Sequence, residues 1–85
     1  MANEVPINFK NLLGEIYTVF IDLELDKVDS DVKRKLGNEI GLSIDEIRFI
    51  FNGKSVYGDD RVLADYNVHK NDIIHFVCRF SKTVG

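Results

Sequence analysis

The sequence has few of the residues that would suggest secretion, membrane insertion or redox chemistry. Cys78 is its one cysteine among 85 residues, so no disulfide can form within the chain. A reducing compartment, cytoplasmic and/or nuclear, is therefore expected. No apolar run approaches the ~20 residues of a membrane span, and the first residues lack a secretory signal pattern. We expect no membrane partner.

An excess of basic charge is also missing. The chain has 11 Lys and Arg against 14 Asp and Glu, a net charge of −3. A general nucleic-acid binder needs a basic face that displaces counterions, so we expect no nucleic-acid partner. The composition, 45% hydrophobic and 29% charged, is typical of a folded domain. The length fits one such domain, which we expect to be a monomer.

Alternation of apolar and polar residues predicts a hairpin at the start of the chain. A first strand begins at Ile7 and leads into a Gly-containing loop over residues 11–16. A second strand shows the same alternation at Val19, Ile21, Leu23 and Leu25. Residues 1–6, before this hairpin, are expected to be flexible, as are residues 81–85.

The period of the apolar residues then changes from two to four. Residues 28, 32, 36 and 40 draw one stripe along a helix. Asp26 or Asp29 is expected to cap the start of this helix, and Gly41 to end it. The basic residues 33–35 lie off the stripe, so we expect them in water.

Three more strands are predicted after the helix, at residues 47–51, 55–57 and 73–80. Asn52-Gly53 is a typical hairpin turn between the first two of them. Residues 43–46 resemble a capping box, and residues 62–66 predict a brief helical turn. The order ββαββ(α)β predicts an α+β fold in which one helix packs across a mixed sheet of four or five strands.

The later segments RFIFNGKSV and VLADYNVHKNDIIHFVCRF resemble the second half of ubiquitin. The first half fits through INFK, the helix VDSDVKRKL and Gly41. The resemblance covers about residues 7–80 and implies a ubiquitin-like domain with the β-grasp fold. Asp65-Tyr66-Asn67 and His75 make it closer to ubiquitin than to SUMO.

The alternation also predicts which side chains face away from the helix. In the last strand these are His75 and Val77, and in the third strand Arg48 and Ile50. Exposed apolar residues are common, and Ile50 and Val77 could simply be good strand formers. The resemblance instead implies a recognition patch with a basic rim, whose edge Leu12 (or Leu13, since the loop is longer) covers. The implied partner-binding residues, with Lys10 as a further rim residue, are Leu12, Arg48, Ile50, Gly53, Lys54, His75, Val77 and Arg79.

A second surface follows from the same resemblance. Leu42, Cys78 and Phe80 correspond to an apolar strip that some ubiquitin partners use, although a dimer contact or a flanking segment would explain it equally. Asn8 replaces an aromatic residue of a further ubiquitin patch, and Phe20, which points outward, rebuilds part of it. The lysines that match chain-carrying lysines of ubiquitin are Lys10, Lys33, Lys35, Lys54 and Lys70.

The resemblance implies a non-catalytic domain, N-terminal in a larger protein, that acts in the ubiquitin–proteasome pathway and protein degradation. The implied partners are helical ubiquitin-binding motifs, proteasome subunits or a AAA-type ATPase. The alternative is a free ubiquitin-like modifier conjugated through a terminal Gly85. A third hypothesis is a scaffold or inhibitor that imitates ubiquitin without being attached. The Arg-Gly-Gly tail of ubiquitin is replaced here by the sequence SKTVG.

No residue pattern indicates an active site, cofactor or metal. His75 and Cys78 are three apart in a strand, so their side chains leave opposite faces and cannot act as base and nucleophile together. The two histidines and one cysteine lack zinc-ligand spacing. Gly53-Lys54-Ser55 lacks the first glycine of a phosphate loop, and Asp59-Asp60 is interpreted as a solvated turn. We expect no enzymatic activity.

Overall fold

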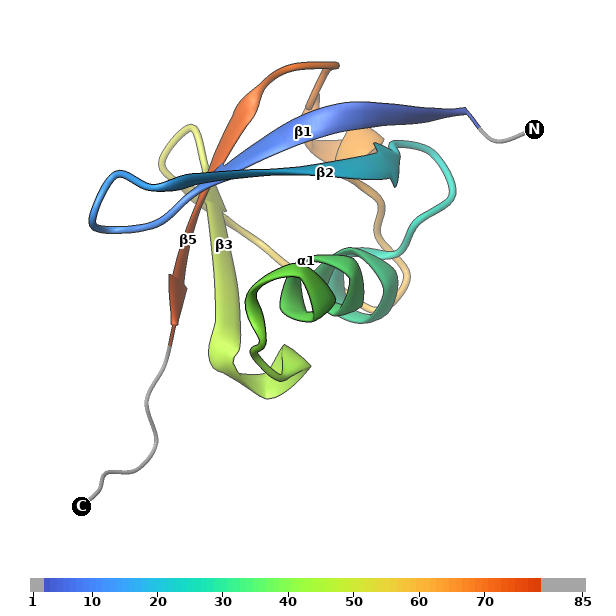
Figure 1. Ribbon diagram of the computed structural model, residues 1–85. Helices are drawn as coiled ribbons and strands as arrows, with labels where there is room; N and C mark the ends of the chain where they lie inside the picture. Colours follow the sequence, from blue (N-terminus) through green and yellow to red (C-terminus); the bar gives the residue numbers. More distant parts are fainter. Residues whose placement is uncertain (1–2, 79–85) are drawn as a thin grey trace.

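The computed structural model describes residues 3–78. A five-stranded sheet with the order β2-β1-β5-β3-β4 forms one layer, and helix α1 packs across one face of it (Figure 1). The central strand β5 runs parallel to β1 and antiparallel to β3, so the sheet is mixed. The predicted α+β fold, one helix across a mixed β-grasp sheet, is confirmed.

The first hairpin pairs β1 (Glu4–Lys10) with β2 (Ile16–Asp22). The strand therefore starts before Ile7, and the expectation that residues 4–6 are flexible is wrong: they pair with residues 20–22. Asn11 organises the loop, because its Oδ1 accepts hydrogen bonds from the backbone N–H groups of Leu13 and Glu15 at 3.0 and 2.9 Å.

The second strand is shorter than the alternation predicted. It ends at Asp22, whose Oδ1 accepts hydrogen bonds from the backbone N–H groups of Glu24 and Leu25 at 3.0 and 3.1 Å. Such a side-chain turn competes with the strand ladder. Leu25 consequently lies in the turn and is 70% exposed.

The helical segment begins with a wide turn, η1 (Val28–Val32), and continues as α1 (Lys33–Ile40). Val28, Val32 and Leu36 are fully buried, as the stripe predicted. Gly41 ends the helix with a φ of 78°, a left-handed conformation that glycine adopts at little cost.

The predicted capping of the helix is wrong. Neither Asp26 nor Asp29 caps it; instead Asp31, inside the first turn, accepts a hydrogen bond from the Lys27 N–H at 3.0 Å. Asp26 accepts a hydrogen bond from the Asp22 N–H, and Asp29 pairs with Lys33 at 3.2 Å. Both carboxylates are therefore engaged elsewhere.

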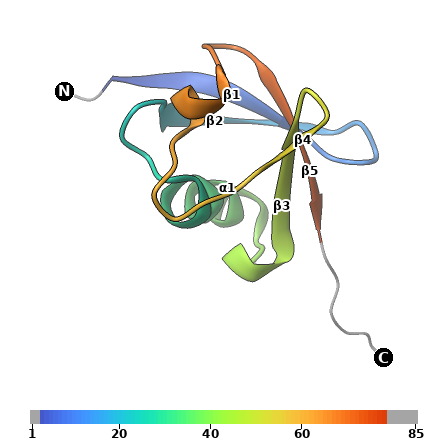
Figure 2. The same cartoon turned by 180° about the vertical axis from the view of Figure 1, so that it is seen from behind.

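The second half of the chain follows the predicted order. Ser43 donates its N–H to Glu46 Oε1 at 3.3 Å at the start of η2 (Ile44–Glu46). Strand β3 (Ile47–Phe51) turns through Asn52 and Gly53, both with positive φ, into β4 (Lys54–Val56), one residue earlier than expected. The last elements are η3 (Leu63–Tyr66) and β5 (Ile73–Cys78). Figure 2 shows β4 beside β3 at the edge of the sheet.

The hydrophobic core fills the space between the helix and the inner face of the sheet. Every strand and helical segment except η2 contributes at least one side chain that is no more than 2% exposed. This core consists of Ile7, Phe9, Ile21, Val28, Val32, Leu36, Ile47, Phe49, Val56, Leu63, Val68, Ile74 and Phe76.

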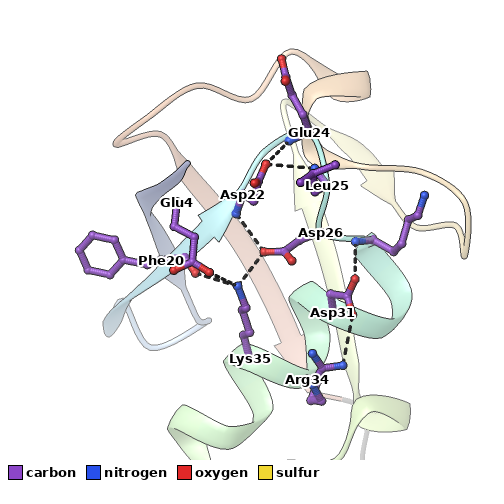
Figure 3. Close-up of polar contacts among 10 residues, drawn as sticks. Glu4, Phe20, Asp22, Glu24, Leu25, Asp26, Asp31, Arg34 and Lys35 are labelled. Atoms are coloured by element: carbon purple, nitrogen blue, oxygen red, sulfur yellow. Dashed lines mark hydrogen bonds and ion pairs between the residues drawn. The ribbon is translucent and has the colours of Figure 1, made fainter. Parts of the chain in front are cut away.

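Two of the three basic residues at the start of α1 are not solvated as expected. The Lys33 side chain is 13% exposed and the Lys35 side chain 25%. Lys35 Nζ lies between acidic groups of the first hairpin and of the turn before η1 (Figure 3). Arg34, whose side chain is 54% exposed, is the solvated one.

Candidate functional site

The face of the sheet that points away from the helix carries the candidate site. Strands β3 and β5 lie side by side, so Ile50 is opposite His75 and Arg48 is opposite Val77. Ile50 and Val77 are half-buried, while Arg48 and His75 are exposed. We call these four residues the Ile50–Val77 patch. The expected division of faces is confirmed, because the intervening Phe49, Ile74 and Phe76 are at most 1% exposed.

The patch continues as one row of side chains across all five strands. Lys10 of β1 is opposite both Ile16 of β2 and His75 of β5. Beyond Ile50 the row ends at Ser55 of β4. A cation and an imidazole thus stand between apolar side chains on this face.

The first hairpin loop does not cover the patch. Leu12 and Leu13 are each 84% exposed, so the expectation that Leu12 shields the patch edge is wrong. The Asn11 side chain fixes the loop backbone by its own hydrogen bonds, and Gly14 completes the turn with a φ of 89°. Both leucines are therefore presented to solvent.

Two further expected residues lie at the β3–β4 turn. Gly53 has a φ of 77°, which the tight hairpin requires. Lys54 is opposite Phe51, so its side chain leaves the sheet on the other face from Ile50. It lines a cavity of about 440 Å³ together with Tyr57 and Tyr66. The register therefore brings Arg48, Ile50, His75 and Val77 together, but not Lys54.

A groove of about 650 Å³ adjoins the patch where β3 extends past the end of β4. Arg48, Ile50 and Val77 form one side of it, and Ile44 and Tyr57 are its most exposed apolar side chains, at 37% and 60%. Two exposed apolar side chains thus lie in the groove beside the patch.

The second expected surface is only partly described. Leu42 and Cys78 are half-buried and pack against the hydrophobic core, which gives them a structural role. Burial, with a smaller contribution from Glu46, raises the pKa of the Cys78 thiol. The expected residues Phe80, Arg79 and Gly85 lie outside the described residues.

Residues 3–78 contain neither a group of metal-ligating side chains nor a helix that could span a membrane. Within residues 3–78, no three His, Cys, Asp or Glu side chains are grouped as metal ligands would be. No helix in this part of the chain is long and apolar enough to cross a bilayer. His75 and Cys78 lie opposite Ile50 and Ile47 respectively, on different faces of the sheet.

Sequence reasoning missed two exposed apolar residues of this face, Ile16 and Ile73. Ile16 is 51% exposed and lies opposite Lys10. Ile73 is 43% exposed and lies on the same side of β5 as His75 and Val77. The alternation that placed Val77 outward could have found it. Phe20, expected to point outward, is 56% exposed and lies opposite Pro6.

Comparison with known families agrees with this geometry. The model of the Ubiquitin family matches residues 7–81, which is most of the chain. The match includes the helix, the Ile50–Val77 patch and all of the sheet after residue 6, and the proteins of this family are generally non-catalytic. The chain therefore contains a ubiquitin-like domain and belongs to the ubiquitin family.

Proposed function

We propose that this protein is a non-catalytic interaction module that binds proteins of the ubiquitin–proteasome system through the Ile50–Val77 patch. The observation that carries the proposal is the register of β3 and β5, which sets two aliphatic side chains beside Arg48 and His75 on an open sheet face. The partners are helical ubiquitin-binding motifs in proteasome subunits, ubiquitin receptors or a AAA-type ATPase.

Recognition divides between apolar and charged groups. Ile50 and Val77 gain free energy by leaving water when an apolar helix face covers them. Arg48 has no ion-pair partner among residues 3–78, so it can meet an acidic residue beside the apolar stripe. Because the patch is small, one contact should bind with a Kd of roughly micromolar or weaker.

The test is a titration of the isotope-labelled domain with a synthetic helical ubiquitin-binding peptide, followed by NMR. We expect shifts of the Ile50, His75 and Val77 amides, and an affinity reduced about tenfold by Ile50→Ala, since central apolar residues dominate interfaces. Leu25→Ala is the matched control, because Leu25 is exposed in the turn after β2. Equal affinities for the two variants, with both folded, would overturn the patch.

The proposal also places the domain at the N-terminus of a larger protein of the cytoplasm or nucleus that acts in protein degradation. An antibody against the domain should detect one band well above 9.7 kDa in cell extract, unchanged by inhibitors of conjugation. A band near that mass, with a ladder that the inhibitors remove, would contradict this placement and favour a modifier.

A further inference from the structure

A second group of apolar side chains lies on the outer sheet face, next to the Ile50–Val77 patch along β5. Phe20 of β2 is 56% exposed and lies opposite Pro6 of β1. Ile73 of β5 is 43% exposed and lies opposite Asn8 of β1. We call Pro6, Phe20 and Ile73 the Phe20–Ile73 group. Exposed aromatic and aliphatic residues that gather on one face often mark an interaction site.

Two polar side chains beside the Phe20–Ile73 group, Asn8 and Thr18, already have hydrogen-bond partners. Thr18 Oγ1 donates to Asn8 Oδ1 at 2.7 Å, and Asn8 Nδ2 donates to the Asn71 carbonyl oxygen at 3.1 Å. A partner that covers them therefore leaves these two groups bonded, so the desolvation cost is lower than for unpaired groups.

Charge is unevenly distributed between this face and the rest of the protein. Of the 14 acidic residues, all within residues 3–78, Glu4 and Asp22 are the two that lie in strands. Glu4 is paired with Lys35 at 2.8 Å, and Asp22 is 8% exposed and bonded to the following turn. Lys10 and Arg48 remain on the face. The strands of this net acidic protein thus place no unpaired carboxylate on the face, and two exposed ones, Asp45 and Asp59, line the adjoining groove.

The spacing of the two apolar groups matches a helix. Ile73 and Val77 are four residues apart on one strand, and at 3.2–3.4 Å per residue this is roughly 13 Å. A helix that rises 1.5 Å per residue covers about 12 Å in eight residues. Positions i, i+4 and i+7 or i+8 lie on one stripe of such a helix. One helix of about three turns therefore reaches both groups.

We propose that the outer face binds one acidic amphipathic helix of a partner protein, laid along β5, with one anchor on the Ile50–Val77 patch and a second, seven or eight residues away, on the Phe20–Ile73 group. This inference rests on the proposed function and extends it. The second anchor selects partners, because a helix with a single apolar anchor contacts the patch alone. The cations Lys10 and Arg48 on the face favour acidic residues flanking the anchors.

Two synthetic acidic helical peptides test this proposal. One carries a single leucine anchor, and the other has a second leucine anchor eight positions away; calorimetry gives their affinities for the domain. We expect the two-anchor peptide to bind about tenfold tighter, as expected for one more buried apolar side chain. The double variant Phe20→Thr/Ile73→Thr should lose this gain and keep its affinity for the one-anchor peptide. Threonine favours strands, so the fold should persist, which circular dichroism checks.

Several outcomes separate this inference from the proposed function. Two results would contradict the second anchor and leave the patch intact. One is equal affinity of the two peptides for the wild-type domain, and the other is a gain in affinity that the double variant retains. If Ile50→Ala leaves the affinity of the one-anchor peptide unchanged, the proposed function of the Ile50–Val77 patch is wrong. Sedimentation could also show a dimer of the free domain that the double variant no longer forms. The Phe20–Ile73 group would then be a contact between two copies of the domain, which would contradict the helix-binding proposal.

Discussion

Lys35 of α1 and Glu4 at the start of β1 are 31 residues apart in sequence, yet Nζ lies 2.8 Å from Glu4 Oε2. The same Nζ lies 2.7 Å from Asp26 Oδ2 and donates to the Phe20 carbonyl oxygen at 3.4 Å (Figure 3). Burial disfavours the charge of Lys35, but the hydrogen bonds to Asp26 and Glu4 outweigh it, so the pKa of Lys35 is raised. One ammonium group thus holds the helix to both strands of the first hairpin.

Lys35→Met is expected to lower the free energy of unfolding by about 1–3 kcal/mol, because methionine keeps the apolar stem and loses the hydrogen bonds to charged groups. Urea denaturation measures the change. Arg34→Met is the matched control on the next residue, where the exposed pair with Asp31 should contribute about 0.5 kcal/mol or less. The interpretation of Lys35 is wrong if both variants lose the same small amount.

Gly37→Ala is expected to destabilise the domain, although alanine is the better helix former by about 1 kcal/mol. Gly37 is buried in α1, and a Cβ there would overlap the Leu42 carbonyl oxygen, which is backbone and cannot rotate away. We expect a net loss of about 1–3 kcal/mol, typical of overpacking. Thermal denaturation measures it.

Asn38→Ala is the control for this substitution, because Asn38 is exposed on the same helix. It should raise stability by up to about 0.5 kcal/mol through helix propensity alone. A stabilised Gly37→Ala variant would show that the backbone around Leu42 moves to accept the methyl group.

Acid should destabilise the domain partly through Asp31. The hydrogen bond from the Lys27 N–H, opposed by burial and helped by Arg34, lowers the pKa of Asp31 below its ordinary value of 3.8. The folded protein therefore binds this proton less readily than the unfolded chain. The stabilisation is present above pH 3.8 and is lost as pH falls through the lower, folded pKa.

Asp31→Asn should reduce the loss of stability between about pH 5 and about pH 3, because asparagine accepts the Lys27 hydrogen bond without a charge to neutralise. Denaturation curves at several pH values measure this slope. Arg34→Met removes a lesser cause of the shift, so it should retain most of the acid sensitivity. An unchanged slope in Asp31→Asn would assign the acid sensitivity to other carboxyl groups.

The sequence predicted the elements better than their ends. The apolar alternation located β3 and β5, and the four-residue period located the buried stripe of Val28, Val32 and Leu36. The alternation could not predict where β2 ends. The Asp22 side chain accepts hydrogen bonds from the next backbone N–H groups, so the strand stops before Leu25. Local polar bonds decide ends, whereas burial decides the presence of a strand.

The candidate site was also predicted only in part from the alternation of apolar and polar residues. Alternation within one strand was enough to put Ile50, His75 and Val77 on the outer face. Other placements depend on interactions outside a single strand. Lys54 opposite Phe51 leaves the patch, and Leu12 is 84% exposed in a loop that the Asn11 side chain organises. Neither the register nor the loop hydrogen bonds can be read from the alternation of a single strand.

The ion pairs of α1 also bear on the lysines that match chain-carrying positions of ubiquitin. An amine attacks an acyl donor only after it has lost its proton and can reach the donor. Lys35, with its raised pKa and its contacts to Glu4 and Asp26, fails on both counts, and Lys33 is 13% exposed beside Asp29. Lys54 and Lys70 are exposed. The packing of the helix on the first hairpin therefore makes Lys35 a poor nucleophile, whereas Lys54 of β4 and Lys70 of the turn before β5 stay accessible.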